Sequence, residues 1–130
     1  MCGQVRYEIN GDCREIIACH CTECRKMSGH YTAATATRPE NLRLLNDAGL
    51  AWYRSSTVAQ RGFCKNCGST LFWKPDSGDR ISIYAGTIDG DTGLAVTAHI
   101  FMDEKGDYYE IEEGVARHDK GGATLTLDKP

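Results

Sequence analysis

The sequence lacks the features that mark membrane, secreted and nucleic-acid-binding proteins. No stretch approaches the roughly 18 consecutive apolar residues of a membrane helix, and the residues after Met1 contain no apolar core of a signal peptide. Lysine and arginine form no run, and the net charge of −3 disfavours binding through phosphate attraction. We therefore expect a cytoplasmic protein that binds neither membranes nor nucleic acids.

Two common catalytic patterns are missing as well. The chain shows no Ser/His/Asp pattern and no phosphate-binding glycine loop, which disfavours a hydrolase or a nucleotide-dependent enzyme. Its 130 residues, 41% hydrophobic and 25% charged, fit one globular domain. We expect residues 1–118 to form that domain. Residues 119–130 are glycine-rich and then polar, which is typical of a loose C-terminal tail.

Helical periodicity is scarce, and short alternating runs dominate. The runs Gln4–Ile9 and Glu15–Cys19 flank an Asn-Gly-Asp turn signal and predict a hairpin. Further strands are predicted at Tyr31–Thr37, Leu42–Leu45, Ala51–Arg54, Gln60–Cys64, Thr70–Trp73, Arg80–Ala85, Ala98–Met102 and Tyr108–Ile111. One short helix is predicted over Thr22–Ser28, capped near Thr22 and ended by Gly29. The pattern therefore predicts a mainly β fold with antiparallel sheets and one short helix.

Seven cysteines are the most informative feature of the chain. Thiols stay reduced in the cytoplasm, and an odd number cannot pair completely within one chain, so metal ligation is the leading interpretation. Cys19 and Cys21 share one face if they end a strand, while Cys21 and Cys24 share one side of a first helical turn. Three sulfurs can thus converge on one metal. Three protein ligands commonly leave a fourth position for substrate, although a neighbouring side chain could also close the site.

A second group contains the Cys64 and Cys67 pair, which is followed by a glycine. A C-x-x-C turn before glycine is typical of a metal knuckle, because two sulfurs face one way and glycine permits the tight backbone. A redox pair is the alternative, but it calls for a thioredoxin-like βαβ context that is absent. In the predicted hairpin Cys2 lies near Cys21, whereas Cys13 lies at the other end, ~30 Å away in extended geometry, as an ordinary thiol.

With these motifs in place, the chain resembles the glutathione-dependent formaldehyde-activating enzyme family, which includes centromere protein V. The resemblance runs from about Cys2 to Arg117. The motifs that carry it are Cys2-Gly3-Gln4-Val5-Arg6-Tyr7, Cys19-His20-Cys21, Cys24-Arg25-Lys26, Ser28-Gly29, Tyr53-Arg54-Ser55-Ser56, Arg61-Gly62-Phe63-Cys64, Cys67-Gly68, Leu71-Phe72, Ala85-Gly86-Thr87-Ile88-Asp89, His99-Ile100-Phe101 and Tyr109-Glu110-Ile111.

The resemblance implies tent-like antiparallel β-sheets around two zinc sites. The exposed, catalytic site would take Cys19, Cys21 and Cys24. The structural site would take Cys2, Cys64 and Cys67. The family's first cysteine of an N-terminal C-x-C would precede Met1, so the fourth structural ligand would come from an upstream residue, from water or from another side chain.

The resemblance also implies carbon–sulfur lyase chemistry, in which a small thiol such as glutathione adds to an aldehyde such as formaldehyde. Zinc can hold a thiolate nucleophile or polarise a carbonyl, so this chemistry is physically coherent. One alternative is a non-catalytic zinc-binding module for a protein partner, which predicts a closed triplet with no pocket beside it. A thiol redox protein without stoichiometric metal is another. Zinc is favoured over iron because no cluster-type spacing of four cysteines is present.

Side chains outside the cysteine groups carry weaker signals. Arg25, Lys26 and Arg54 are candidates for a glutathione carboxylate, although we expect solvated surface charges. We expect His99 to be a hydrogen-bonded strand histidine and His20 to point away from the triplet. The larger aromatic residues are expected to belong to the core rather than to a substrate platform: Trp52, Phe72, Trp73 and Phe101.

Overall fold

The computed structural model describes residues 1–122, which are dominated by β-strands. The strands are β1 (Arg6–Ile9), β2 (Ile16–Cys19), β3 (Thr32–Thr37), β4 (Leu42–Asn46), β5 (Leu50–Ser56), β6 (Ala59–Cys64), β7 (Thr70–Pro75), β8 (Ile81–Tyr84), β9 (Val96–Ile100) and β10 (Ala116–Arg117). Within this part of the chain there is one α-helix, α1 (Thr22–Ser28), with three short 3-10 turns at Pro39–Asn41, Ala85–Thr87 and Met102–Glu104. The predicted mainly β fold with one short helix is confirmed.

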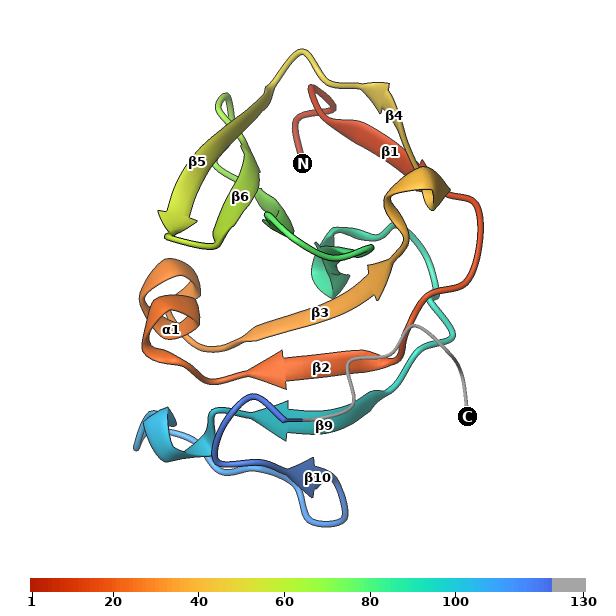
Figure 1. The fold of residues 1–130 in the computed structure, drawn as a ribbon. Helices are drawn as coiled ribbons and strands as arrows, with labels where there is room; N and C mark the ends of the chain where they lie inside the picture. Colours follow the sequence, from red (N-terminus) through yellow and green to blue (C-terminus); the bar gives the residue numbers. More distant parts are fainter. Residues whose placement is uncertain (123–130) are drawn as a thin grey trace.

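The strands form one long mixed sheet and one small sheet. The long sheet has the order β10-β9-β2-β3-β8-β7-β6-β5, and β1 pairs with β4 in the small one. Strand β9 runs parallel to both β2 and β10, and the other pairs are antiparallel. The β5–β6 end of the long sheet rises away from β2, β3 and β9, and the β1–β4 pair lies across from these lower strands (Figure 1). The bend produces the tent-like arrangement.

The main hydrophobic core lies between the small sheet and the middle of the long sheet. Its fully buried centre includes Phe72 and Ile83, against which Tyr7 of β1 and Leu42 of β4 pack. The alternation of strands β7 and β8 turns these residues to one face, as the period of two requires. Tyr7 meets Phe72 edge to ring at a centroid distance of 5.2 Å. This core fixes the part of the sheet that carries the cavity described below.

The helix α1 has the predicted bounds but a different N-terminal cap. Gly29 ends the helix in the left-handed region, with φ of 80°, and its N–H donates to the carbonyl of Arg25. Cys21 occupies the cap position without a side-chain hydrogen bond. The exposed N–H of Thr22 instead donates to the Glu104 carboxylate at 2.7 Å. A carboxylate from a distant loop therefore satisfies the helix start, which a local sequence pattern does not reveal.

The predicted hairpin between residues 4–9 and 15–19 is wrong. Strand β1 pairs with β4, and β2 lies between β3 and β9. The segment after β1 crosses to β3, where the carbonyl of Asp12 accepts a hydrogen bond from the Thr37 hydroxyl at 2.7 Å. A side chain at Gly11 would lie 2.5 Å from Asn41, so this crossing needs glycine. Three of the four residues of the apolar β2 are buried, and such a strand needs a neighbour on each side, which a two-stranded hairpin does not supply.

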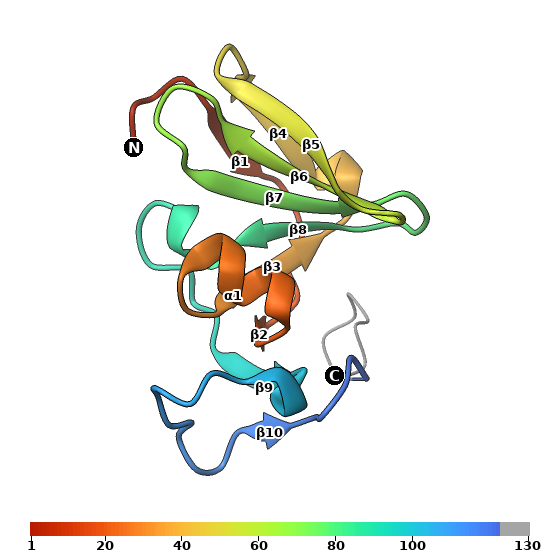
Figure 2. The same cartoon turned by 90° about the vertical axis from the view of Figure 1, so that its left-hand side faces the viewer.

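Near the C-terminal end, the chain departs from the prediction in one more strand. Residues 108–111 are not a strand, because Tyr109 turns toward His20 and hydrogen-bonds to it. Strand β10 forms this edge of the long sheet instead. It lies next to β9 in the lower part of Figure 2. Of the tail predicted over residues 119–130, residues 123–130 lie outside the described part of the chain. Among the described residues, no helix is long and apolar enough to span a membrane.

Candidate metal centre and its cavity

The first cysteine group forms where β2 passes into α1. Cys19 ends the strand, Cys21 caps the helix and Cys24 lies in its first turn. The three Sγ atoms all lie within 4.8 Å of one another. Cys24 is buried, while Cys19 and Cys21 are half-buried. The local C-x-C-x-x-C spacing therefore brings the three sulfurs together, as its strand and helix periods predict.

A buried arginine supports this group from the neighbouring part of the sheet. Arg61 of β6 is only 3% exposed, and its Nη2 atom lies 3.9 Å from Cys24 Sγ and 3.3 Å from a Glu23 carboxylate oxygen. The other terminal nitrogen donates a hydrogen bond to the Tyr84 hydroxyl. Burial by itself would lower the pKa of Arg61, but Tyr84 and Cys24 raise it above its usual value. Arg61 is thus a permanent positive charge beside the sulfur of Cys24.

The electrostatics of the group favour a thiolate at its inner end. Hydrogen bonds from Cys19 and Cys21 are the largest cause that lowers the pKa of Cys24 to about 2, with smaller contributions from Thr32 and Arg61. Hydrogen bonds with Cys21 and Cys24, and then burial, raise the pKa of Cys19. The cluster therefore holds its first negative charge at Cys24. Thiolates are the form in which cysteine binds metals, so this environment suits a metal centre.

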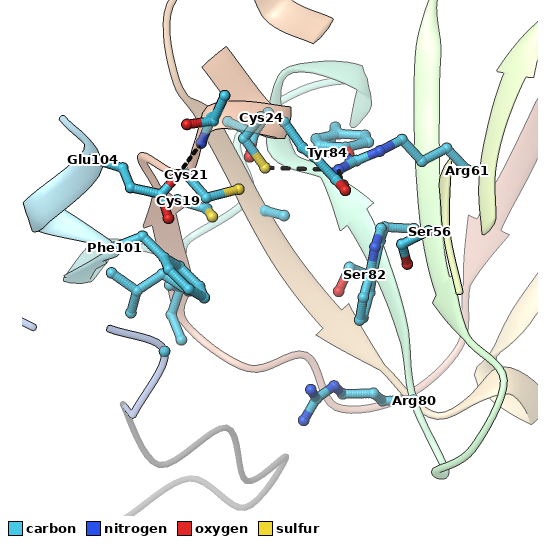
Figure 3. Close-up of a pocket in the computed structure, with 18 of the residues that line it drawn as sticks. Cys19, Cys21, Cys24, Ser56, Arg61, Arg80, Ser82, Tyr84, Phe101 and Glu104 are labelled. Atoms are coloured by element: carbon cyan, nitrogen blue, oxygen red, sulfur yellow. Dashed lines mark hydrogen bonds and ion pairs between the residues drawn. The ribbon is translucent and has the colours of Figure 1, made fainter. Parts of the chain in front are cut away.

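The three sulfurs form part of the wall of a cavity of about 590 Å³. Its other walls come from β3, β5, β6, β7, β8 and the loop after β9. Figure 3 shows the cysteines on one side of this space, Ser56 and Ser82 across from them, and Arg80 farther away. Phe101, in the left-handed region with φ of 57°, contributes an apolar surface. A ligand on the metal would therefore have room to extend away from the sulfurs.

The donor set fits a tetrahedral soft metal such as zinc. Three thiolates suit zinc, and a site with three protein ligands that borders a cavity has the arrangement of catalytic zinc sites. Among residues 1–122, the side chains at this site whose ligand atoms lie close together are Cys19, Cys21 and Cys24. Glu104 lines the same cavity, but its carboxylate accepts the N–H of Thr22.

The second group contains Cys2, Cys64 and Cys67, whose sulfurs also lie within 4.8 Å of one another. Cys2 Sγ is 3.6 Å from the buried Cys64 Sγ. Gly68, with φ of 76°, closes the turn by donating its N–H to the Cys64 carbonyl at 2.7 Å. Backbone N–H groups of Ser69 and Cys2, in that order, lower the pKa of Cys67 to about 7. This knuckle geometry is compatible with a second metal ion.

Cys2 reaches this group by a different path from the one that the hairpin predicted. The register placed Cys2 near Cys21, but β1 lies on the small sheet and its leading residues run beside the turn before β5. There the N–H of Gly49 donates to the carbonyl of Gln4 at 2.9 Å. A side chain at Gly49 would contact Cys64 Sγ at 3.0 Å, so the close approach depends on glycine. Cys13 belongs to neither group.

The two histidines near the triplet lie behind it rather than in the cavity. His20 is fully buried, and its ring bonds to the Tyr109 hydroxyl through Nδ1 and to His99 through Nε2, at 2.8 Å for the latter. Burial first, and then His99, lower the pKa of His20 to about 4. His20 thus points away from the triplet and His99 is a hydrogen-bonded strand residue, as predicted. Together they join the Cys19–Cys21 turn to β9.

The three candidate basic residues lie outside the cavity, and Lys26 and Arg54 are exposed surface charges, as expected. Arg25 and Lys26 do not line it, and Arg54 pairs with Asp76 at 2.6 Å on the surface. The cavity instead contains three arginines that sequence reasoning missed: Arg14, Arg61 and Arg80. One signal was available for Arg61, because it shares a strand face with the buried Ala59. Nothing local distinguishes the other two.

The aromatic residues divide between core and cavity. Phe72 is fully buried, as predicted. Trp52 stacks on Phe72 at a centroid distance of 6.0 Å but remains 38% exposed. Phe101 packs against the buried residues Ile17, Ala98 and Ile100, as predicted, and it also lines the cavity. For Trp73 the prediction of a core position is wrong, because Trp73 is half-buried and lines the cavity.

Comparisons with known proteins agree with this geometry. The family model for the glutathione-dependent formaldehyde-activating enzyme matches residues 1–104, which include both cysteine groups. An uncharacterized lyase of Schizosaccharomyces pombe is 32% identical over 99 residues, which make up 75% of this chain and 71% of that protein. A crystal structure of a Rhodobacter sphaeroides protein is similar with a TM-score of 0.55 and 26% identity, over 70% of this chain and 85% of that one. The chain therefore belongs to the glutathione-dependent formaldehyde-activating enzyme family.

Proposed function

We propose that this protein is a zinc-dependent carbon–sulfur lyase that adds a small thiol, such as glutathione, to an aldehyde, such as formaldehyde, and reverses the addition. The observation that carries the proposal is the position of the three sulfurs of Cys19, Cys21 and Cys24 in the wall of a cavity of about 590 Å³. The family membership and the lyase name of the yeast relative support the same reaction class.

In this proposal the two cysteine groups have different tasks. Cys19, Cys21 and Cys24 hold the catalytic zinc, and Cys2, Cys64 and Cys67 hold a structural one. When bound at the first group, zinc lowers the pKa of a thiol or polarises a carbonyl. The hydrogen bonds from Cys19 and Cys21, with a smaller contribution from Arg61, favour the thiolate form of Cys24. His20 and His99 hold the turn between Cys19 and Cys21 against β9.

The reaction balances without a redox partner. The sulfur of the thiol attacks the aldehyde carbon and forms the carbon–sulfur bond, while the π pair of the carbonyl moves to its oxygen. That oxygen takes up a proton to give the hydroxyalkyl thioether, and this proton replaces the one that the thiol released when it became a thiolate. In reverse, the hydroxyl loses its proton, the carbon–sulfur bond breaks and the aldehyde leaves. The cavity walls around Trp73 and Phe101 orient the substrate and limit its contact with water.

The far part of the cavity favours a thiol that carries an anionic group. Arg14 and Arg80 both line it. Burial first, and then the charge of Arg80, lower the pKa of Arg14 to about 10, so two guanidinium groups share this end of the cavity. Guanidinium groups bind carboxylates through paired N–H donors. Glutathione has two carboxylates beyond its thiol, so these arginines are the proposed contacts in place of Arg25, Lys26 and Arg54.

The alternative of a closed, non-catalytic zinc module agrees less well with the geometry. It predicts a fourth side chain on the triplet and no pocket, whereas the sulfurs border a cavity and, among the described residues, the group has three members. A redox pair is also disfavoured, because Cys64 and Cys67 form a knuckle with Cys2 rather than a helix-borne pair. The single domain over residues 1–118 and its cytoplasmic location are part of the proposal.

Exchange spectroscopy tests the proposed reaction. Formaldehyde and glutathione equilibrate with S-hydroxymethylglutathione without enzyme. The measurement is therefore the rate of exchange between the NMR signals of glutathione and of S-hydroxymethylglutathione. The zinc-loaded protein should accelerate this exchange, Cys21→Ser should not, and Cys13→Ser, whose sulfur lies outside both groups, should match the wild type. Exchange at the uncatalysed rate with zinc-loaded wild type would refute the proposal.

A further inference from the structure

The hydrogen bond between Arg61 and Tyr84 has a fixed direction. A guanidinium group has only donors, so the Tyr84 hydroxyl oxygen accepts the hydrogen bond from Arg61. The hydroxyl hydrogen of Tyr84 must then point to a different acceptor. Among the described residues, the structure gives the hydroxyl of Tyr84 no acceptor for that hydrogen. Tyr84 is half-buried, and an O–H group in such a place generally has a partner.

Tyr84 has a well-defined position beside the cysteine group. It ends β8, where its backbone pairs with Ala34 of β3, and its carbonyl accepts a hydrogen bond from the Thr87 hydroxyl at 2.7 Å. Its side chain lines the cavity together with Cys24, and Figure 3 shows Tyr84 next to the contact between Arg61 and Cys24. The donor is therefore held on a strand rather than on a mobile loop.

We propose that Tyr84 is a catalytic residue whose hydroxyl donates a hydrogen bond to the substrate oxygen, the atom that gains negative charge as the carbon–sulfur bond forms. This inference rests on the proposed function, since it assigns a residue to that reaction. The required acceptor is an aldehyde or hydroxyalkyl oxygen on the carbon next to the substrate sulfur. A cavity that contains Cys24 and Tyr84 in adjoining walls can hold sulfur and oxygen of such a ligand at the same time.

The arrangement is preorganised for charge on oxygen. Arg61 donates a hydrogen bond to the Tyr84 hydroxyl. A hydroxyl group that accepts a hydrogen bond from a cation is polarised, and it then donates its own hydrogen more strongly. Because Arg61 is 3% exposed, the pair is held in a low-dielectric environment where such donors act strongly. Removing one donor of this kind in other enzymes lowers kcat by about 10²–10³.

The test compares Tyr84→Phe with Tyr53→Phe. Tyr53 is exposed on the adjacent part of the sheet, and its ring packs on Phe63, so its hydroxyl is a matched control. For Tyr84→Phe we expect kcat to fall about 100-fold, while the KM for the thiol and the zinc content stay near those of wild type. Tyr53→Phe should match wild type. Unchanged kcat in Tyr84→Phe, or a fall that follows loss of zinc, would overturn the catalytic assignment.

A binding measurement reads the hydrogen bond without turnover. The S-acetyl and S-isopropyl derivatives of glutathione have similar shapes, but only the first has an oxygen on the carbon next to sulfur. Wild type should bind the acetyl derivative about two- to tenfold more tightly, which is what one hydrogen bond contributes. Tyr84→Phe should abolish the difference and Tyr53→Phe should keep it. Absence of catalysis in wild type would refute the proposed function, whereas an equal preference in wild type and Tyr84→Phe would refute this inference alone.

Discussion

Replacing Arg61 by methionine tests whether this arginine supports the cysteine group or merely pairs with Glu23. Methionine is unbranched and fills a similar volume, so the change removes the charge and the donors with little loss of packing. The Glu23 side chain is 54% exposed, so its ion pair with Arg61 contributes at most about 1 kcal/mol. Hydrogen bonds that involve a charged group contribute about 1.5–3 kcal/mol, and these connect Arg61 to Cys24 and Tyr84.

We therefore expect Arg61→Met to lower the free energy of unfolding by about 2–3 kcal/mol and Glu23→Gln to lower it by less than about 1 kcal/mol. The lost hydrogen bonds are partly offset, because a buried charge no longer needs to be desolvated. Urea unfolding followed by tryptophan fluorescence measures both variants at the same zinc content. Equal losses of unfolding free energy in the two variants would mean that Arg61 stabilises the fold only through its ion pair with Glu23, which would refute this reasoning. No loss in Arg61→Met would refute it as well.

Three further predictions concern other parts of the molecule. Cys2→Ser should lower the zinc content by one ion per chain and reduce thermal stability, while thiol–aldehyde exchange is retained. Cys13→Ser should change neither the zinc content nor the exchange. Elemental analysis and thermal unfolding check both variants. Phe72→Ala should lower the free energy of unfolding by about 3–5 kcal/mol, because the fully buried ring leaves a cavity, and a smaller loss in urea titration would contradict the described core. Arg14→Gln should raise the KM for glutathione several-fold but not that for the uncharged thiol 2-mercaptoethanol; an equal rise for both would exclude a carboxylate contact.

Local structure was predictable where the deciding residues are neighbours in sequence. The helix over Thr22–Ser28 has its predicted bounds because Gly29 can adopt the left-handed conformation that ends it. Most strands follow from alternation and from Gly or Asp turns. The sulfurs of the triplet converge because strand and helix periods act over six residues. In each case the physical cause lies within a few residues of its effect.

Features that depend on distant contacts were not predictable in this way. Strand β2 takes its neighbours from β3 and β9, and β9 lies about eighty residues later in the chain, so the local turn signal suggested the wrong partner. Cys2 was placed with Cys64 and Cys67 by the family resemblance, not by the predicted register. Arg61 and Tyr84 lie on different strands, and their meeting at Cys24 depends on the order of the long sheet.

The most direct test of the central claim is the zinc content of the purified chain, measured by elemental analysis for wild type and Cys21→Ser together. Cys64→Ser serves as a matched variant, because it removes one sulfur from the other group. We predict that wild type contains two zinc ions per chain and that each variant loses one. A wild type without stoichiometric metal, or a Cys21→Ser variant with as much zinc as wild type, would contradict the assignment of Cys19, Cys21 and Cys24 as a metal centre.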